Sequence, residues 1–204
     1  MGRRKASPAV SVAPPEDPEA RAAVARLADE NALLRAALAE ARARLGEAEE
    51  IGGRDPLTTL VDPRQFIREL ERVLSHAARH GTPAALISVD LKDLNAINAG
   101  HGRLSGDAAL RQVARLLKSL IRTSDVAARG EGGAFSLLLD HLDADSALDT
   151  AERIARCIAA HPLDVGHAIV PLDVWVSVAS IMPGDTVEEV LRRAARNRAR
   201  VKEF

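Results

Sequence analysis

The chain has 204 residues, of which 47% are hydrophobic, so it has room for one domain with a sizeable core and for an extension. It carries 28 basic and 29 acidic residues, a net charge of -1, and only 2% of its residues are aromatic. A charge so close to zero, with so few rings on which bases could stack, excludes a general affinity for nucleic acid or for a membrane surface.

The first 17 residues begin MGRRKAS and continue into a Pro-rich run, which predicts a disordered arm. No apolar stretch has the length of a signal peptide or of a membrane helix. The single cysteine, Cys157, cannot form a disulfide framework. We therefore expect a cytoplasmic protein without a membrane partner.

Residues 18–50 are rich in Ala, Leu, Arg and Glu, and their apolar residues follow a seven-residue repeat that predicts a coiled-coil helix. An Asn at a seam position favours a parallel pair in register, so we expect a parallel homodimer. An Ala-rich helix that packs on its own domain is the alternative. The first seam position holds Val24, Asn31, Leu38 and Leu45, and the second holds Leu27, Leu34, Ala41 and Ala48.

Residues 51–204 show the patterns of a globular domain. Apolar periodicity and turn residues predict helices near 63–80, 106–121 and 144–160, and a last helix from Val187. Strands are expected at 84–90, as a pair within 126–140, and near 167–170 and 173–180. This order predicts an α+β fold, a sandwich in which helices flank a central, mostly antiparallel sheet.

Five motifs follow one another along this domain. They are Asp55 to Leu60 with Phe66, Ser88 to Asn98, Gly102 to Asp107, Arg129 to Phe135, and Ala151 to Ile154. In this order and spacing they resemble the motifs of the GGDEF domains that make cyclic di-GMP, over residues 55 to 195. The resemblance implies the nucleotidyl-cyclase-like sandwich of that family.

Other residues stand at some of the family's catalytic positions in this chain. The family's signature hairpin corresponds to Arg129 to Phe135. The resemblance implies that metal ions are held by a carboxylate at the end of the first strand and by the residue at the third position of the GGDEF signature in this hairpin. Asp90 matches the first, but Gly133 and Ala134 stand at the third and fourth letters. A lone carboxylate is a poor magnesium site, so we expect no metal, no cofactor and no catalysis; residual diguanylate cyclase activity is an alternative.

The substrate-binding residues of the family are only partly present. Asn95 and Arg103 stand where the family has Lys and His, and in the last helix both alignments that we considered lose the family's two cations. Asn98 and Asp107 match the family's guanine-reading pair, which implies a vestigial guanine site and, as an alternative function, a GTP sensor. Alternatively, Asn98 turns the chain and Asp107 caps the following helix.

The inhibitory site of the family is retained. Arg122 and Asp125 form an RxxD motif at the family's spacing before the signature, and Arg153 falls on the third position. The resemblance implies that these residues bind cyclic di-GMP. Guanidinium groups bind phosphate and stack on guanine, while a carboxylate accepts hydrogen bonds from the guanine edge. An ion pair between Arg122 and Asp125 beside a solvated Arg153 is the alternative.

Two further patterns have plainer interpretations. His76 and His80 are spaced to share one helix face, but the sequence supplies no evident third metal ligand, so we interpret them as facing solvent. The basic residues between Arg192 and Lys202 are interpreted as complementing the helix dipole rather than as binding nucleic acid or lipid.

We therefore expect a catalytically inactive GGDEF domain that acts as a cyclic di-GMP receptor and signals to an unidentified protein partner. The alternative, from another class of function, is a dimeric scaffold for protein–protein interaction that binds no nucleotide.

Overall fold

The computed structural model describes residues 22, 24, 26–38, 40 and 53–202. The chain divides into two compact units, residues 1–50 and 51–204. In the first unit the described residues are helical, and the seam residues Val24, Leu27, Leu34 and Leu38 are 50 to 64% exposed. The proposed arm and the seam positions Ala41, Leu45 and Ala48 lie outside the described residues. Pairing of two chains therefore stays a prediction.

The second unit is built on a four-stranded sheet with the strand order β2-β3-β1-β6. The strands are β1 (Ala84–Leu91), β2 (Val126–Arg129), β3 (Ala134–Asp140) and β6 (Val174–Ile181). Every neighbouring pair is antiparallel, and β1 is buried along its whole length between β3 and β6. A separate small hairpin pairs β4 (Leu163–Asp164) with β5 (Ile169–Val170).

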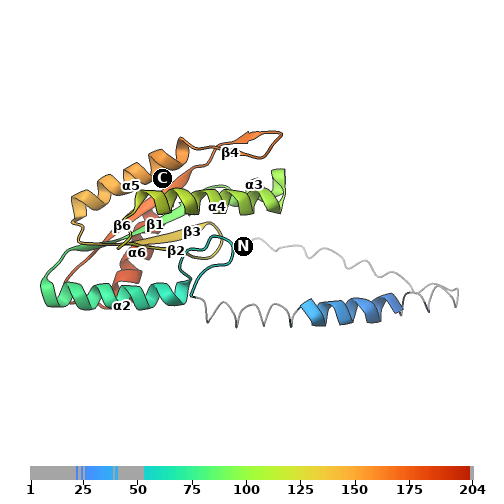
Figure 1. The fold of residues 1–204 in the computed structure, drawn as a ribbon, viewed down its shortest axis with the longest axis horizontal. Helices are drawn as coiled ribbons and strands as arrows, with labels where there is room; N and C mark the ends of the chain where they lie inside the picture. Colours follow the sequence, from blue (N-terminus) through green and yellow to red (C-terminus); the bar gives the residue numbers. More distant parts are fainter. Residues whose placement is uncertain (1–21, 23, 25, 39, 41–52, 203–204) are drawn as a thin grey trace, which may run out of the picture. The chain divides into compact units, whose positions relative to one another are not determined.

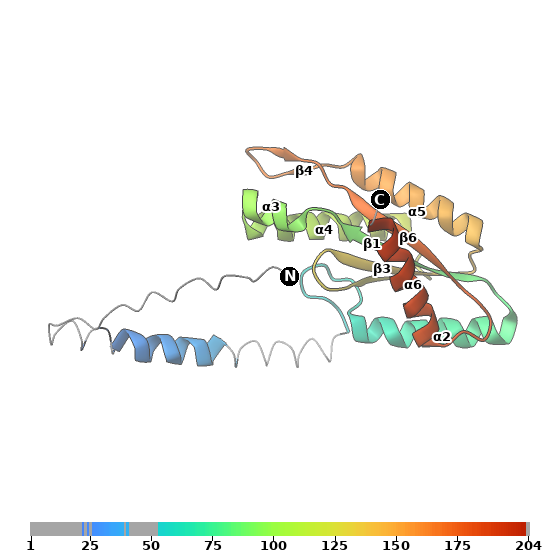
Figure 2. The same cartoon turned by 180° about the vertical axis from the view of Figure 1, so that it is seen from behind.

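Helices cover both faces of this sheet (Figure 1). Side chains of α3 (Leu94–His101), α4 (Arg103–Leu120) and α5 (Ala144–Ala159) pack against one face, together with Ile87 and Val89 of β1. Side chains of α2 (Pro63–His80) and α6 (Val187–Lys202) pack against the other, together with Ala84 and Leu86. Figure 2 shows α6 crossing that second face. The expected α+β sandwich is confirmed.

Local signals in the sequence explain where the helices begin and end. The side chain of Asp62 accepts a hydrogen bond from the Gln65 N–H at the start of α2, and Gly81 ends that helix with a left-handed φ of 64°. Asp143 caps α5 in the same way. At α6, Thr186 and Glu189 exchange hydrogen bonds in a capping box.

The expectations missed one helix. Residues 94–101 form α3, and α4 begins at Arg103 rather than near Gly106. None of the described helices is both long enough and apolar enough to cross a membrane.

Candidate functional site

Arg122, Asp125 and Arg153 line one cavity of about 270 Å³. Arg122 and Asp125 lie in the turn between α4 and β2, and Arg153 comes from α5. The fold therefore brings together the three residues that the sequence singled out, although Arg153 is far from the other two along the chain.

Hydrogen bonds hold two of these side chains. Asp125 Oδ2 accepts a hydrogen bond from the backbone N–H of Arg122 at 2.8 Å, and Arg153 Nη2 donates to the Leu120 carbonyl at 3.0 Å. The described contacts do not include the alternative, an ion pair between Arg122 and Asp125. The Asp125 carboxylate bonds the backbone N–H of Arg122 instead of its guanidinium. Arg122 itself is exposed, so its charged group is available to a ligand.

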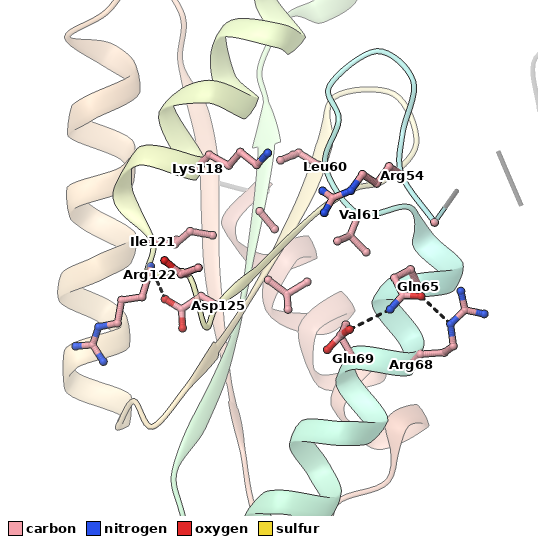
Figure 3. A pocket seen from close by; sticks show the side chains of 14 residues that line it. Arg54, Leu60, Val61, Gln65, Arg68, Glu69, Lys118, Ile121, Arg122 and Asp125 are labelled. Carbon is pink, nitrogen blue, oxygen red and sulfur yellow. Dashed lines mark hydrogen bonds between the residues drawn. The ribbon is translucent and has the colours of Figure 1, made fainter. Parts of the chain in front are cut away.

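A larger cavity of about 670 Å³ adjoins the same turn (Figure 3). Basic and acidic side chains line it together: Arg54, Arg68 and Lys118 are basic, and Glu69 and Asp125 are acidic. In Figure 3 the side chain of Arg122 points away from Arg54 and Arg68. Hydrogen bonds from Arg72 and Gln65 lower the pKa of Glu69 against the effect of its burial, so this carboxylate stays ionised at neutral pH.

Asp90 lies at the end of β1, on the face that α6 covers. Lys202 Nζ is 3.0 Å from Asp90 Oδ1, and Arg198 Nε is 3.7 Å from Asp90 Oδ2. Lys202 also lies 5.3 Å from the ring centre of Trp175, the residue opposite Asp90 on β6. Two cations of the last helix therefore flank the one retained carboxylate.

The signature hairpin packs closely against β1. Leu91 donates a backbone hydrogen bond to the Gly133 carbonyl at 2.9 Å. A Cβ atom at position 133 would lie 3.0 Å from the Leu91 carbonyl oxygen and 3.2 Å from Leu91 Cβ. A side chain at this position would therefore have to displace backbone.

Arg129 fills the inside of that hairpin. Its guanidinium donates to the carbonyls of Gly130, Gly132 and Ala134 and lies 4.9 Å from the ring centre of Phe135. Burial lowers the pKa of the Arg129 guanidinium below its ordinary value. The hairpin is thus held by an arginine that points inward.

Asn98 and Asp107 lie on consecutive helices, α3 and α4. The Asn98 side chain lies over Gly106, where a Cβ atom would be only 2.0 Å from Asn98 Oδ1. The alternative that Asp107 caps a helix is wrong, because α4 begins at Arg103 and its cap residue is Gly102. The absence of a Cβ at Gly106 is what allows the Asn98 side chain to pack against α4 one residue before Asp107.

The sequence missed several residues of these sites. Arg198 and Lys202 reach Asp90, so assigning the basic run to the helix dipole was incomplete. Arg54, Arg68 and Lys118 were not considered, although Lys118 precedes Arg122 by four residues and could have been found from that spacing.

Comparison with known proteins points to one family. The family model described as "Diguanylate cyclase, GGDEF domain" matches residues 53–203. The response regulator PleD of Caulobacter vibrioides is 31% identical over 156 residues, which are 75% of this chain and 34% of PleD. This chain thus corresponds to about a third of the length of that relative.

Solved structures agree with this match. The diguanylate cyclase SiaD of Pseudomonas aeruginosa, in complex with its activator SiaC, aligns with a TM-score of 0.71 and 25% identity over 91% of this chain and 71% of SiaD. The coiled coil and GGDEF domain of DgcB from Caulobacter crescentus, in complex with c-di-GMP, aligns with a TM-score of 0.71 and 26% identity over 88% of this chain and 93% of that one.

Proposed function

The chain belongs to the family of GGDEF domains found in diguanylate cyclases, and within that family we propose that it is a cyclic di-GMP receptor without cyclase activity. The observation that carries the proposal is the arrangement of Arg122, Asp125 and Arg153 around one cavity. The complex of the similar DgcB domain with c-di-GMP supports the choice of ligand.

The chemistry of the cavity suits this ligand. The two arginines can bind the phosphates bidentately or stack on guanine, and Asp125 can accept hydrogen bonds from the guanine edge. The hydrogen bond from the Arg122 backbone fixes the orientation of the Asp125 carboxylate before any ligand arrives. Less side-chain freedom is then lost on binding.

Two features support the absence of catalysis. Nucleotidyl transfer needs metal ions on hard oxygen ligands, and magnesium is usually held by carboxylates together with substrate phosphates. Gly133 brings no carboxylate, and a Cβ atom at this position would lie in tight contact with Leu91, 3.0 Å from its carbonyl oxygen. Lys202 Nζ and Arg198 Nε lie 3.0 and 3.7 Å from the Asp90 carboxylate, so a metal ion at Asp90 would have to compete with these two cations.

We also propose that the receptor passes its signal to a protein partner. An intercalated pair of nucleotides on Arg122, Asp125 and Arg153 would change the surface that a partner meets. The complex of the similar SiaD with its activator SiaC is a precedent for a protein partner in this family. The exposed apolar residues Leu34 and Leu38 further support a parallel dimer of the receptor.

The binding site is tested by substituting its arginines. Arg122→Ala and Arg153→Ala should each weaken binding of cyclic di-GMP to the full chain by at least roughly tenfold, because each removes a charge-assisted contact to the ligand. Arg115→Ala is the matched control, since Arg115 is an exposed arginine of α4 outside both cavities and its loss should leave affinity unchanged. Equal affinities of all four proteins would contradict the site.

The absence of catalysis is tested with GTP and magnesium. No sustained release of pyrophosphate above a protein-free blank is expected, because the second metal carboxylate is missing. Turnover that persists in the purified chain and disappears in Asp90→Ala would show a working cyclase and contradict this half of the proposal.

A further inference from the structure

Half of the six histidines of the chain gather at one place. The ring centre of His76 lies 4.6 Å from that of His80 and 5.2 Å from that of His141. Asp140 lies between them, with Oδ2 4.0 Å from His76 Nδ1 and Oδ1 3.3 Å from His141 Nδ1. One ligand atom each from His76, Asp140 and His141 lie within 4.8 Å of one another.

The local backbone produces this cluster. His76 belongs to α2, and Asp140 is the last residue of β3. Successive residues of a strand normally point to opposite faces. His141 leaves the strand with a left-handed φ of 54°, which breaks this alternation and lets two neighbouring residues serve one site. The sequence did not reveal that Asp140 and His141 join His76 and His80, because these two residues come from a distant segment of the chain.

The donor atoms match one class of ion. Imidazole nitrogen and carboxylate oxygen are ligands of zinc and of similar transition metals, whereas calcium and magnesium take mainly oxygen. Tetrahedral zinc with bonds of about 2.0–2.1 Å places its ligand atoms about 3.3 Å apart. The distance from Asp140 to His141 already has this value, and the distance from Asp140 to His76 exceeds it by less than an ångström.

The surroundings also fit a metal centre. The Asp140 side chain is only 13% exposed, which strengthens its attraction for a cation. The Thr82 hydroxyl lies 3.1 Å from His76 Nδ1, the nitrogen that faces Asp140, so a metal ion bound there would replace this contact. His80 follows one helical turn after His76 and stands beside its ring. Asp140 pairs with Ala84 at the opposite end of β1 from Asp90, so this cluster is separate from the catalytic position of the family.

We propose that His76, Asp140 and His141 bind one divalent transition metal ion of the zinc class, with water as the fourth ligand. Binding would join the C-terminal end of α2 to the end of β3. It would also place the ion at the border of the cavity of Arg122 and Arg153, because Asp140 lines that cavity as well.

Titration of the untagged full chain with zinc, in competition with a chromophoric chelator, tests the site. One ion per chain should bind with micromolar or tighter affinity, and cobalt should give the visible absorption of a tetrahedral centre. His141→Asn and Asp140→Asn should weaken binding at least roughly tenfold, as loss of a ligand requires. Asn is chosen at position 141 because it accepts a left-handed backbone.

The other pair of neighbouring histidines provides the control. His101 and His167 have ring centres 5.5 Å apart, and the double variant His101→Ala with His167→Ala should bind zinc as the native chain does. Zinc should raise the melting temperature of the native and control chains but not of His141→Asn. If a ligand variant fails to fold by circular dichroism, His76→Gln replaces it. Lack of stoichiometric binding, or equal affinity in the ligand variants and the native chain, would overturn the proposal.

Discussion

Gly133 is the residue on which the proposed absence of catalysis chiefly depends. Its carbonyl accepts a hydrogen bond from the Leu91 N–H, and a side chain at position 133 would lie in tight contact with Leu91. The sequence predicted the loss of the carboxylate but not this contact, because the distance between hairpin and strand depends on how the sheet is assembled. The same reason hid the approach of Lys202 and Arg198 to Asp90, which depends on the path of α6 across the sheet.

Gly133→Ala should lower the free energy of unfolding by about 1–2 kcal/mol, because the added methyl group must displace the backbone of Leu91. Urea unfolding measures this change. Gly100→Ala is the matched control, since Gly100 lies in α3 with nothing within 4 Å of the added atom, and it should be neutral or slightly stabilising. Unchanged stability of Gly133→Ala would mean that the hairpin has room for a side chain after all.

At the level of elements, helices with clear end signals were predicted well and the weakly marked one was missed. Asp62, Pro63 and Gly81 mark both ends of α2, and its bounds agree with the prediction. The sequence of α3, LNAINAGH, contains two Asn and a Gly, which are poor helix formers, and Asp93 before it has a positive φ of 54°. Tertiary packing of Ile97 into the core stabilises α3 despite this composition.

The start of α6 is fixed by an ion pair that should make stability depend on pH. Arg193 donates two hydrogen bonds to Asp185, at 2.7 and 2.9 Å, and these lower the pKa of Asp185 below its ordinary value of 3.8. Since the folded-state pKa is the lower one, the stabilisation is fully present above pH 3.8 and is lost as the pH falls through the folded-state value.

Asp185→Asn should therefore lower the free energy of unfolding by about 1–2 kcal/mol at pH 7, and its difference from the native chain should shrink at pH 3. Urea unfolding at the two pH values measures this. Asp149→Asn, an exposed carboxylate of α5, should change stability by less than about 0.5 kcal/mol. A difference that is equally large at both pH values would contradict the assignment.

At the scale of the whole molecule, the sequence predicted the sandwich, and it singled out Arg122, Asp125 and Arg153, which line one cavity, because the motifs follow the family in order. The sequence could not predict the shapes of the cavities, nor that Arg54, Arg68 and Lys118 line the larger one from different parts of the chain. Pairing of two chains stays a prediction at this scale; the large apolar side chains of the described N-terminal helix are at least half exposed in the single chain.

Leu34→Glu should raise the dissociation constant of the dimer at least roughly a hundredfold, because burying each Leu stabilises by about 1.5–3 kcal/mol and a dimer loses two. Analytical ultracentrifugation measures this. Leu33→Glu is the matched control, since Leu33 lies outside the predicted seam and is 72% exposed. Equal dissociation constants for the two variants would contradict the predicted seam.

Calorimetric titration of cyclic di-GMP into the full chain, with GTP and magnesium titrated in parallel, measures whether the chain is a receptor. We expect micromolar or tighter binding of cyclic di-GMP, a free energy of about -8 kcal/mol or better, with two nucleotides per chain and at least roughly tenfold weaker binding to Arg122→Ala. No heat of binding from cyclic di-GMP at tens of micromolar protein would contradict the receptor function and favour a scaffold.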